Sequence, residues 1–223
     1  MLIPLKDLNP RRSFPIVNLL LIATNIAVFL YEVSLPERVQ NAFVLANATV
    51  PSHVLSFLTG PTTFSAAFLP LLTSMFLHSG ILHIAGNMLF LYIFGDNIED
   101  YFGHLPYLFF YLACGVGAGL LHVAFNLHSH LPALGASGAI SGVMGAYLIL
   151  YPKSRVLTLI FIFLVPLPAI FVLGYWFVIQ FLEGISSLGM AGAGGVAWWA
   201  HVGGFVLGML FASAAGRRQL QRA

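Results

Sequence analysis

The sequence predicts an all-α, polytopic membrane protein: a bundle of six transmembrane helices with both termini in the cytoplasm. Of its 223 residues, 59% are hydrophobic and only 7% are charged, which is too apolar for a water-soluble domain. The apolar segments have the length of membrane-crossing helices and lack the period-two alternation of barrel strands. The basic residues, in turn, gather on one side of the predicted bundle.

Helices are expected wherever an apolar stretch is long enough to cross the hydrocarbon core. The predicted helices cover residues 16–33, 80–98, 105–126, 136–151, 156–183 and 197–214. The first is interpreted as a retained helix, because no small-residue cleavage site follows a short apolar core. The segment from Leu35 to Leu72 contains four prolines and is predicted to be a structured loop or a partly embedded hairpin.

The whole chain, 1–223, is predicted to be one membrane domain. Within it, residues 1–15 are expected to form a cytoplasmic N-terminus, 34–79 the first external loop and 215–223 a basic cytoplasmic tail. If the N-terminus is inside, eight of the nine Lys and Arg residues lie on the cytoplasmic side and only Arg38 lies outside. This distribution follows the positive-inside rule and fixes the orientation.

The orientation places three polar side chains at a similar depth below the outer surface. His83 lies near the start of the second predicted helix, Ser137 at the start of the fourth and His201 near the start of the sixth. All three helices enter from the outer face, and polar groups in lipid are costly unless they share a cavity. A polar site is therefore predicted there.

Ser137 is a candidate nucleophile because glycines flank it where a loop turns into a helix. Gly135 and Gly138 allow close approach of a substrate carbonyl, and the helix start offers unpaired amide groups to a developing oxyanion. The alternative is that the glycines serve helix packing and that Ser137 only caps the helix.

His201 is the candidate base for Ser137. Gly204 and Gly208 form a stripe of small residues beside it, and Gly138 and Gly142 form a matching stripe on the fourth helix, so these two helices are expected to pack closely. The alternative is a histidine with a purely packing or hydrogen-bonding role. No Asp or Glu lies in these outer helix segments, so a Ser-His dyad is expected and not a triad.

His83 and Asn87 lie four residues apart on one face of the second helix. Their imidazole and amide donors suit an oxyanion hole; the alternative is an interhelical hydrogen bond. A metal site is not expected despite eight histidines, because the chain has no His-Glu-x-x-His motif and no acidic ligand near His201. No cofactor is predicted, and a net charge of +2 does not indicate nucleic-acid binding.

Together these motifs resemble the rhomboid family of intramembrane serine proteases. The resemblance rests on Gly135-Ala136-Ser137-Gly138, on Ala200-His201-Val202-Gly203-Gly204, and on His83 followed four residues later by Asn87. It implies a multi-pass serine endopeptidase that cuts peptide bonds in or near transmembrane segments, with Ser137 and His201 as the dyad and His83 and Asn87 as oxyanion donors. His78 resembles a structural histidine of the family, and Gly135, Gly138 and Gly204 are expected to be structural near the site.

Two further features follow from the resemblance. Many relatives carry an aromatic residue four positions after the nucleophile, where this chain has Ser141, so another residue, such as one of the Trp198-Trp199 pair, would have to support the His201 ring. Relatives also use a mobile fifth helix as a substrate gate, for which Pro166, Pro168 and the glycine-rich segment 188–195 are candidate hinges.

The expected partners are transmembrane protein substrates and the lipid bilayer. The expected location is a prokaryotic cell (inner) membrane, with the active site opening to the extracytoplasmic side. The sequence does not specify the substrate or the oligomeric state. Two other functions stay open: a catalytically silent relative that binds transmembrane clients, and a small-solute transporter, although a transporter would more naturally show paired repeats and interrupted helices.

Overall fold

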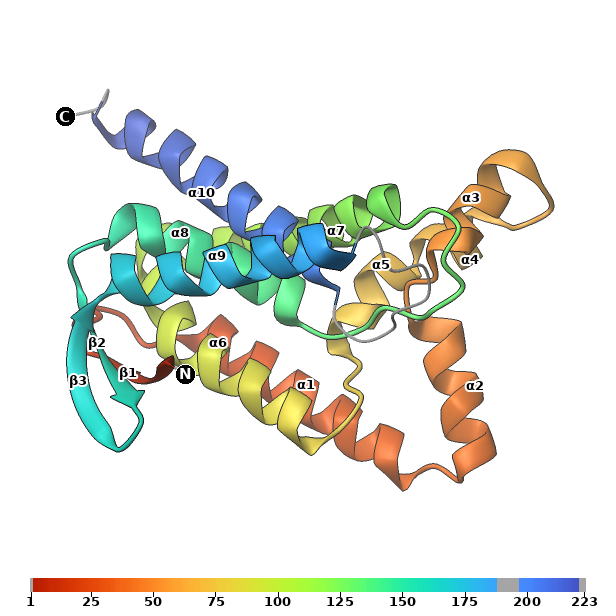
Figure 1. The fold of residues 1–223 in the computed structure, drawn as a ribbon, viewed down its shortest axis with the longest axis horizontal. Helices are drawn as coiled ribbons and strands as arrows, with labels where there is room; N and C mark the ends of the chain where they lie inside the picture. Colours follow the sequence, from red (N-terminus) through yellow and green to blue (C-terminus); the bar gives the residue numbers. More distant parts are fainter. Residues whose placement is uncertain (1, 188–196, 221–223) are drawn as a thin grey trace.

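The computed structural model describes residues 2–187 and 197–220 and has the predicted helical membrane fold (Figure 1). Within these residues, five helices are long and apolar enough to cross a bilayer. They are α1 (Ile16–Ser34), α6 (Ile81–Phe102), α7 (His104–Phe125), α9 (Ala169–Ser187) and α10 (Trp198–Leu220). Five of the six predicted helices therefore have a spanning counterpart, although the one at 156–183 begins later than expected.

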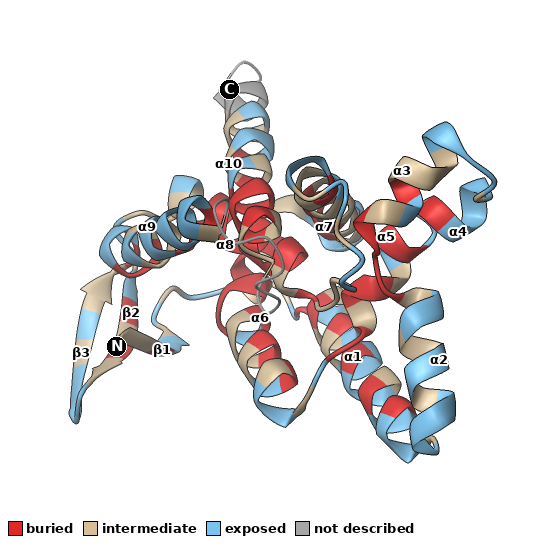
Figure 2. Ribbon diagram, turned by 45° about the vertical axis from the view of Figure 1, so that its right-hand side comes forward, coloured by how far each residue is buried: buried red, intermediate tan, exposed pale blue. Residues whose placement is uncertain are grey.

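The sixth predicted helix, α8 (Ser137–Leu150), has only 14 residues and lies at the centre of the bundle. It contacts α6, α7, α9 and α10, and every residue from Gly138 to Tyr147 is buried (Figure 2). At 1.5 Å per residue α8 is about 21 Å long, less than the roughly 30 Å of a hydrocarbon core. One end of α8 must therefore lie below a membrane surface.

The close packing of α8 against α10 confirms the pairing predicted from the glycine stripes. A Cβ atom added to Gly204 would collide with the carbonyl oxygen of Gly138, and one added to Gly208 would collide with that of Gly142. The two helix backbones are thus in direct contact, as small residues permit in membranes. This contact fixes the helix of Ser137 relative to the helix of His201.

The predicted helix over 156–183 is wrong in its first part, which forms a β-hairpin of β2 (Arg155–Ile160) and β3 (Phe163–Pro168). The N-terminal residues also contribute a strand, β1 (Leu2–Asp7), and the antiparallel sheet has the order β1-β2-β3. Apolar residues with β-branched or aromatic side chains favour a strand as well as a buried helix. Pro166 and Pro168 would break a helix here.

The candidate hinge residues Pro166 and Pro168 accordingly lie in β3, before the spanning helix α9 and not within it. The other candidate hinge, segment 188–195, lies outside the described residues.

The segment predicted as a structured first loop folds into four short α-helices and one 3-10 turn. These are α2 (Glu37–Asn47), α3 (Pro51–Thr59), α4 (Phe64–Phe68), α5 (Pro70–Thr73) and η1 (Ser74–Phe76). Pro36 precedes α2, while Pro51 and Pro70 are the first residues of α3 and α5. Proline is favoured at these positions because the first amide groups of a helix have no intrahelical acceptor.

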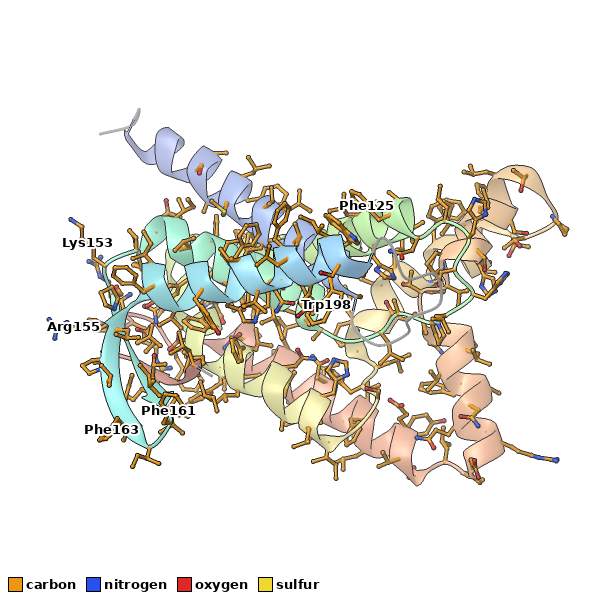
Figure 3. All side chains as sticks on the ribbon, viewed as in Figure 1. Phe125, Lys153, Arg155, Phe161, Phe163 and Trp198 are labelled. Atoms are coloured by element: carbon orange, nitrogen blue, oxygen red, sulfur yellow. The ribbon has the colours of Figure 1, made fainter. Side chains whose placement is uncertain are left out.

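Basic residues gather at the end of the bundle where α8 finishes and the sheet lies. Lys153 and Arg155 project from this end (Figure 3), and Arg11 pairs there with Asp96 at 3.1 Å. Arg38 lies in α2, at the opposite end of the molecule (Figure 1). This arrangement agrees with the one-sided charge distribution that the sequence predicted.

Candidate active site

The structure brings Ser137 and His201 into hydrogen-bond contact, as predicted. Ser137 is the first residue of α8, and His201 lies in the first turn of α10. The distance from Ser137 Oγ to His201 Nε2 is 2.7 Å. The imidazole is buried while Ser137 is partly exposed, so the hydroxyl faces the more open side of the pair.

The alternative interpretation of Ser137 as a helix cap is wrong. The N-cap position of α8 is Ala136, and no side chain caps the helix. The Ser137 hydroxyl is hydrogen-bonded to the imidazole instead. The first amide groups of α8 have no acceptor within the helix, so they lie beside the hydroxyl as free donors.

Gln180 of α9 holds the other side of the imidazole. Its amide oxygen Oε1 lies 2.6 Å from His201 Nδ1, and both side chains are buried. An amide oxygen only accepts hydrogen bonds, so Nδ1 of the neutral ring carries the proton. Nε2 is then unprotonated and faces the Ser137 hydroxyl, which is the tautomer that a general base requires.

Two tryptophans flank the His201 ring where an aromatic residue at position 141 is missing. The Trp176 ring lies 5.8 Å from the imidazole and the Trp198 ring 6.2 Å, measured between centroids. Of the tryptophan pair considered from the sequence, Trp198 thus lies beside His201, whereas Trp199 stacks on Phe125. Ser141 donates its hydroxyl hydrogen bond to the carbonyl oxygen of Ser137 at 2.6 Å.

The sequence analysis assigned no role to Trp176 or Gln180, which both lie on α9. Their spacing was the missed signal, because residues four apart lie on one face of a helix. A buried amide on a spanning helix requires a partner, and the Nδ1 atom of His201 is that partner.

His83 and Asn87 line the backbone that leads into Ser137. A Cβ atom placed on Gly135 would lie 2.8 Å from His83 Nε2 and 3.7 Å from Asn87 Nδ2. Gly135 also has a φ of +119°, a conformation that residues with a side chain rarely adopt. Gly135 is therefore required both for its backbone conformation and for the space beside these two side chains.

Both side chains present donors toward this backbone. The Ser79 amide donates to His83 Nδ1 at 3.4 Å, and Ser79 Oγ lies 3.0 Å from the same nitrogen. Because Nδ1 accepts, the proton of the neutral ring resides on Nε2. The buried Asn87 Nδ2 is without a hydrogen-bond partner in the described part of the chain. Neither donor is thus committed to the interhelical hydrogen bond considered as the alternative.

His78 lies behind these donors and does not reach Ser137 through any hydrogen bond in the described residues. It is buried, and its ring packs edge-on against His83 at 5.1 Å between centroids. Burial, together with the neighbouring His83, lowers the pKa of His78 to about 4, so its imidazole is neutral at pH 7. A structural role for His78, as expected from the sequence, stays a prediction.

A cavity of about 40 Å³ opens beside Ser137. Its polar lining includes Ser74, His122 and Ser137, and small residues such as Gly115 and Ala118 form much of the rest. A cavity of this size has room for water beside these polar groups, since one molecule requires on the order of 10–15 Å³ on this measure.

The sequence of this chain is similar to those of known proteins. A family profile described as "Rhomboid domain" matches residues 65–218, more than half of the chain. RHOMBOID-like protein 12, mitochondrial, of Arabidopsis thaliana is 34% identical over 148 residues, covering 57% of this chain and 43% of the relative. Rhomboid protein 1, mitochondrial, of Saccharomyces cerevisiae is 30% identical over 162 residues, covering 67% and 43%.

A bacterial relative is also similar. Rhomboid protease GluP of Bacillus subtilis is 39% identical over 85 residues, covering 38% of this chain and 16% of the relative. The chain spans less than half the length of each of these three relatives. Because they come from mitochondria as well as from a bacterium, their names do not support the predicted prokaryotic membrane over another.

Proposed function

The chain belongs to the rhomboid family of integral membrane proteins, and on that premise we propose that it is an intramembrane serine endopeptidase. The observation that supports this most strongly is the 2.7 Å contact between Ser137 Oγ and His201 Nε2. A protein that only binds transmembrane clients needs neither a hydroxyl paired with an imidazole nor an acceptor that sets its tautomer. The proposed substrates are membrane proteins cleaved in or near a transmembrane segment.

In the first step, Ser137 Oγ attacks the carbonyl carbon of the scissile peptide bond while its proton passes to His201 Nε2. The tetrahedral intermediate then collapses: the C–N bond breaks, and His201 returns the proton to the leaving amine. An ester joins the substrate carbonyl to Ser137. Gln180 accepts from Nδ1–H throughout, which keeps Nε2 directed at the reacting atoms.

The negative charge of the tetrahedral oxygen develops beside Gly135 and the start of α8. His83 Nε2, Asn87 Nδ2 and the backbone amide of Ser137 are the proposed donors to this oxygen. Donors already in place cost no reorganisation when the charge appears, so they stabilise the transition state more than the substrate. Asn87 Nδ2, which lacks a partner in the described chain, gains one only when the oxyanion forms.

Water then hydrolyses the ester. A water molecule gives one proton to His201, its oxygen attacks the acyl carbon, and His201 returns the proton to Ser137 as the ester bond breaks. The cavity beside Ser137 offers space for that water. Since Ser137 begins α8 and Lys153 and Arg155 follow the other end of that helix, the site is proposed to open to the extracytoplasmic side.

The proposal is tested by incubating the purified protein in liposomes with a fluorescently labelled single-span substrate. We expect cleavage within or near the span by the wild type and none by Ser137→Ala. If the wild type binds the substrate but leaves it intact under conditions where its fold is preserved, the client-binding function replaces the proteolytic one.

Replacing Gln180 with leucine is expected to lower kcat by on the order of 10²- to 10⁴-fold, because the base loses the acceptor that sets its tautomer. KM should change little, since Gln180 contacts the base and not the substrate. Glutamate offers an acceptor oxygen at the same position, so Gln180→Glu should recover much of the loss. Steady-state kinetics of both variants check this; equal losses of kcat in the two would contradict an orienting role.

Asn87→Ala is expected to lower kcat by about 10²- to 10³-fold, the usual effect of losing one oxyanion donor, with KM nearly unchanged. Asn97→Ala is the matched control, because Asn97 lies on the same helix about 15 Å further along and binds Asp7 instead. Kinetics and thermal midpoints should be measured for both. If the two variants lose activity equally, Asn87 acts through stability and not through the oxyanion.

A further inference from the structure

The β2-β3 hairpin ends in an apolar tip that little of the described chain covers. Phe161 and Ile162 are each 83% exposed, Phe163 66% and Leu164 57%. The hairpin runs across the helix axes at the basic end of the bundle, and its tip points away from the helices (Figures 1 and 3). It therefore extends along the plane in which that membrane surface lies.

The free edge of this hairpin is nearly without hydrogen-bond donors. The amide of Ala169 donates to the carbonyl of Ser154. In an antiparallel ladder, pairs that exchange hydrogen bonds alternate with pairs that do not. The next pair, Arg155 and Pro168, is therefore one that does not. Pro166 lies two residues earlier, in an equivalent pair with Leu157. Both proline nitrogens thus point away from β2, at positions where other residues would present free N–H groups.

This edge favours lipid over a protein strand as the neighbour. Unpaired backbone N–H groups are costly in a bilayer, and the two prolines remove two of them from this edge. The same prolines disfavour strand addition by a partner protein, which depends on those donors. The other edge of β2 is covered by β1, so the free edge of the sheet on this side is that of β3, where Leu164 is the residue that still presents an outward N–H group.

The basic residues at the base of the hairpin, and the apolar surface of α9 that adjoins it, also favour the bilayer as the neighbour of the hairpin. Lys153 and Arg155 are exposed at the base of the hairpin, where they complement anionic lipid headgroups. At the other end of β3, the exposed side chains of Ile170, Phe171 and Tyr175 begin the lipid-facing surface of α9. The apolar tip is thus joined to a surface that already faces acyl chains.

The turn conformation adds a separate indication. Phe161 has a φ of +55°, at a position of a two-residue hairpin turn where glycine is favoured. A bulky residue there is energetically unfavourable. That an exposed aromatic ring nevertheless occupies this position indicates a contact with something outside the described chain.

We propose that this hairpin is an interfacial membrane anchor. Residues 161–164 insert among the acyl chains of the leaflet on the basic side of the protein, while Lys153 and Arg155 lie at the lipid phosphates. The inference is independent of the proposed proteolysis.

The test uses an environment-sensitive fluorophore on Phe161→Cys in a Cys114→Ala background, reconstituted at one protein per nanodisc of phosphatidylcholine and phosphatidylglycerol. Lys153→Cys is the matched control at the base of the same hairpin. We expect the label at 161 to be quenched by lipids with a nitroxide near the headgroup and to resist aqueous iodide several-fold better than the label at 153. Phe163→Cys, outside the turn, should give the same result even if Phe161→Cys alters the turn.

Two outcomes would overturn the proposal. Equal quenching of the tip and base labels by iodide would place the tip in water. Protection from iodide without quenching by the nitroxide lipids would show that another part of the chain covers the tip. The thermal midpoint of each labelled variant verifies that the fold is retained.

Discussion

Replacing Ser137 with alanine is expected to lower kcat for a transmembrane substrate by at least about 10³-fold, and His201→Ala should do the same. The hydroxyl at 2.7 Å from Nε2 is a weak nucleophile without the base, and the base has nothing to activate without the hydroxyl. The rate of substrate cleavage in liposomes, measured under single-turnover conditions, gives the chemical step directly.

The double variant Ser137→Ala/His201→Ala distinguishes a catalytic pair from two independent contributions. Residues that act as a unit are strongly non-additive, so the double variant should be no slower than either single variant. A double variant much slower than both would contradict the dyad. Substantial activity in Ser137→Ala would show that another residue is the nucleophile.

Gly204→Ala is expected to lower both stability and activity, because its Cβ atom would meet the Gly138 carbonyl oxygen of α8. Backbone atoms cannot rotate aside, so α8 and α10 must separate. Overpacking typically costs about 1–3 kcal/mol of unfolding free energy even where side chains can adjust. A 1 Å displacement between Ser137 and His201 would add a loss of about 10²-fold in rate. Thermal midpoints in detergent and cleavage rates measure the two effects.

Gly174→Ala is the matched control for this prediction. Gly174 lies in the spanning helix α9, and among the described residues no atom outside its own stretch of helix lies within 4 Å of where its Cβ would be. Alanine also favours a helix over glycine by about 1 kcal/mol, so this variant should be as stable as the wild type or more so. Equal losses in Gly174→Ala and Gly204→Ala would contradict direct backbone contact between α8 and α10.

The sequence predicted those features of the molecule that follow from hydrophobic length, charge and small-residue spacing. The spanning helices have lengths that a bilayer requires, and the glycine stripes of α8 and α10 require a close partner. Because helix direction follows from the position of the basic residues, Ser137 and His201 could be placed at one depth before any contact between them was known.

Features that depend on tertiary pairing could not be predicted in this way. The apolar run 156–168 is compatible with helix or strand, and only its pairing with β1 makes it a strand. The partner of His201 Nδ1 comes from Gln180, 21 residues earlier on another helix. The spacing of Trp176 and Gln180 indicates that they share one helix face, but it does not indicate which helix that face contacts.

The most direct test of the proposed nucleophile is covalent labelling with a fluorophosphonate or isocoumarin probe, followed by peptide mass mapping. We expect one adduct, on Ser137, in the wild type. We also expect it in Ser141→Ala, which alters the serine one turn further along α8, but not in Ser137→Ala or His201→Ala. An unlabelled but folded wild type, or an adduct that persists in Ser137→Ala, would contradict the assignment of Ser137 as the activated serine.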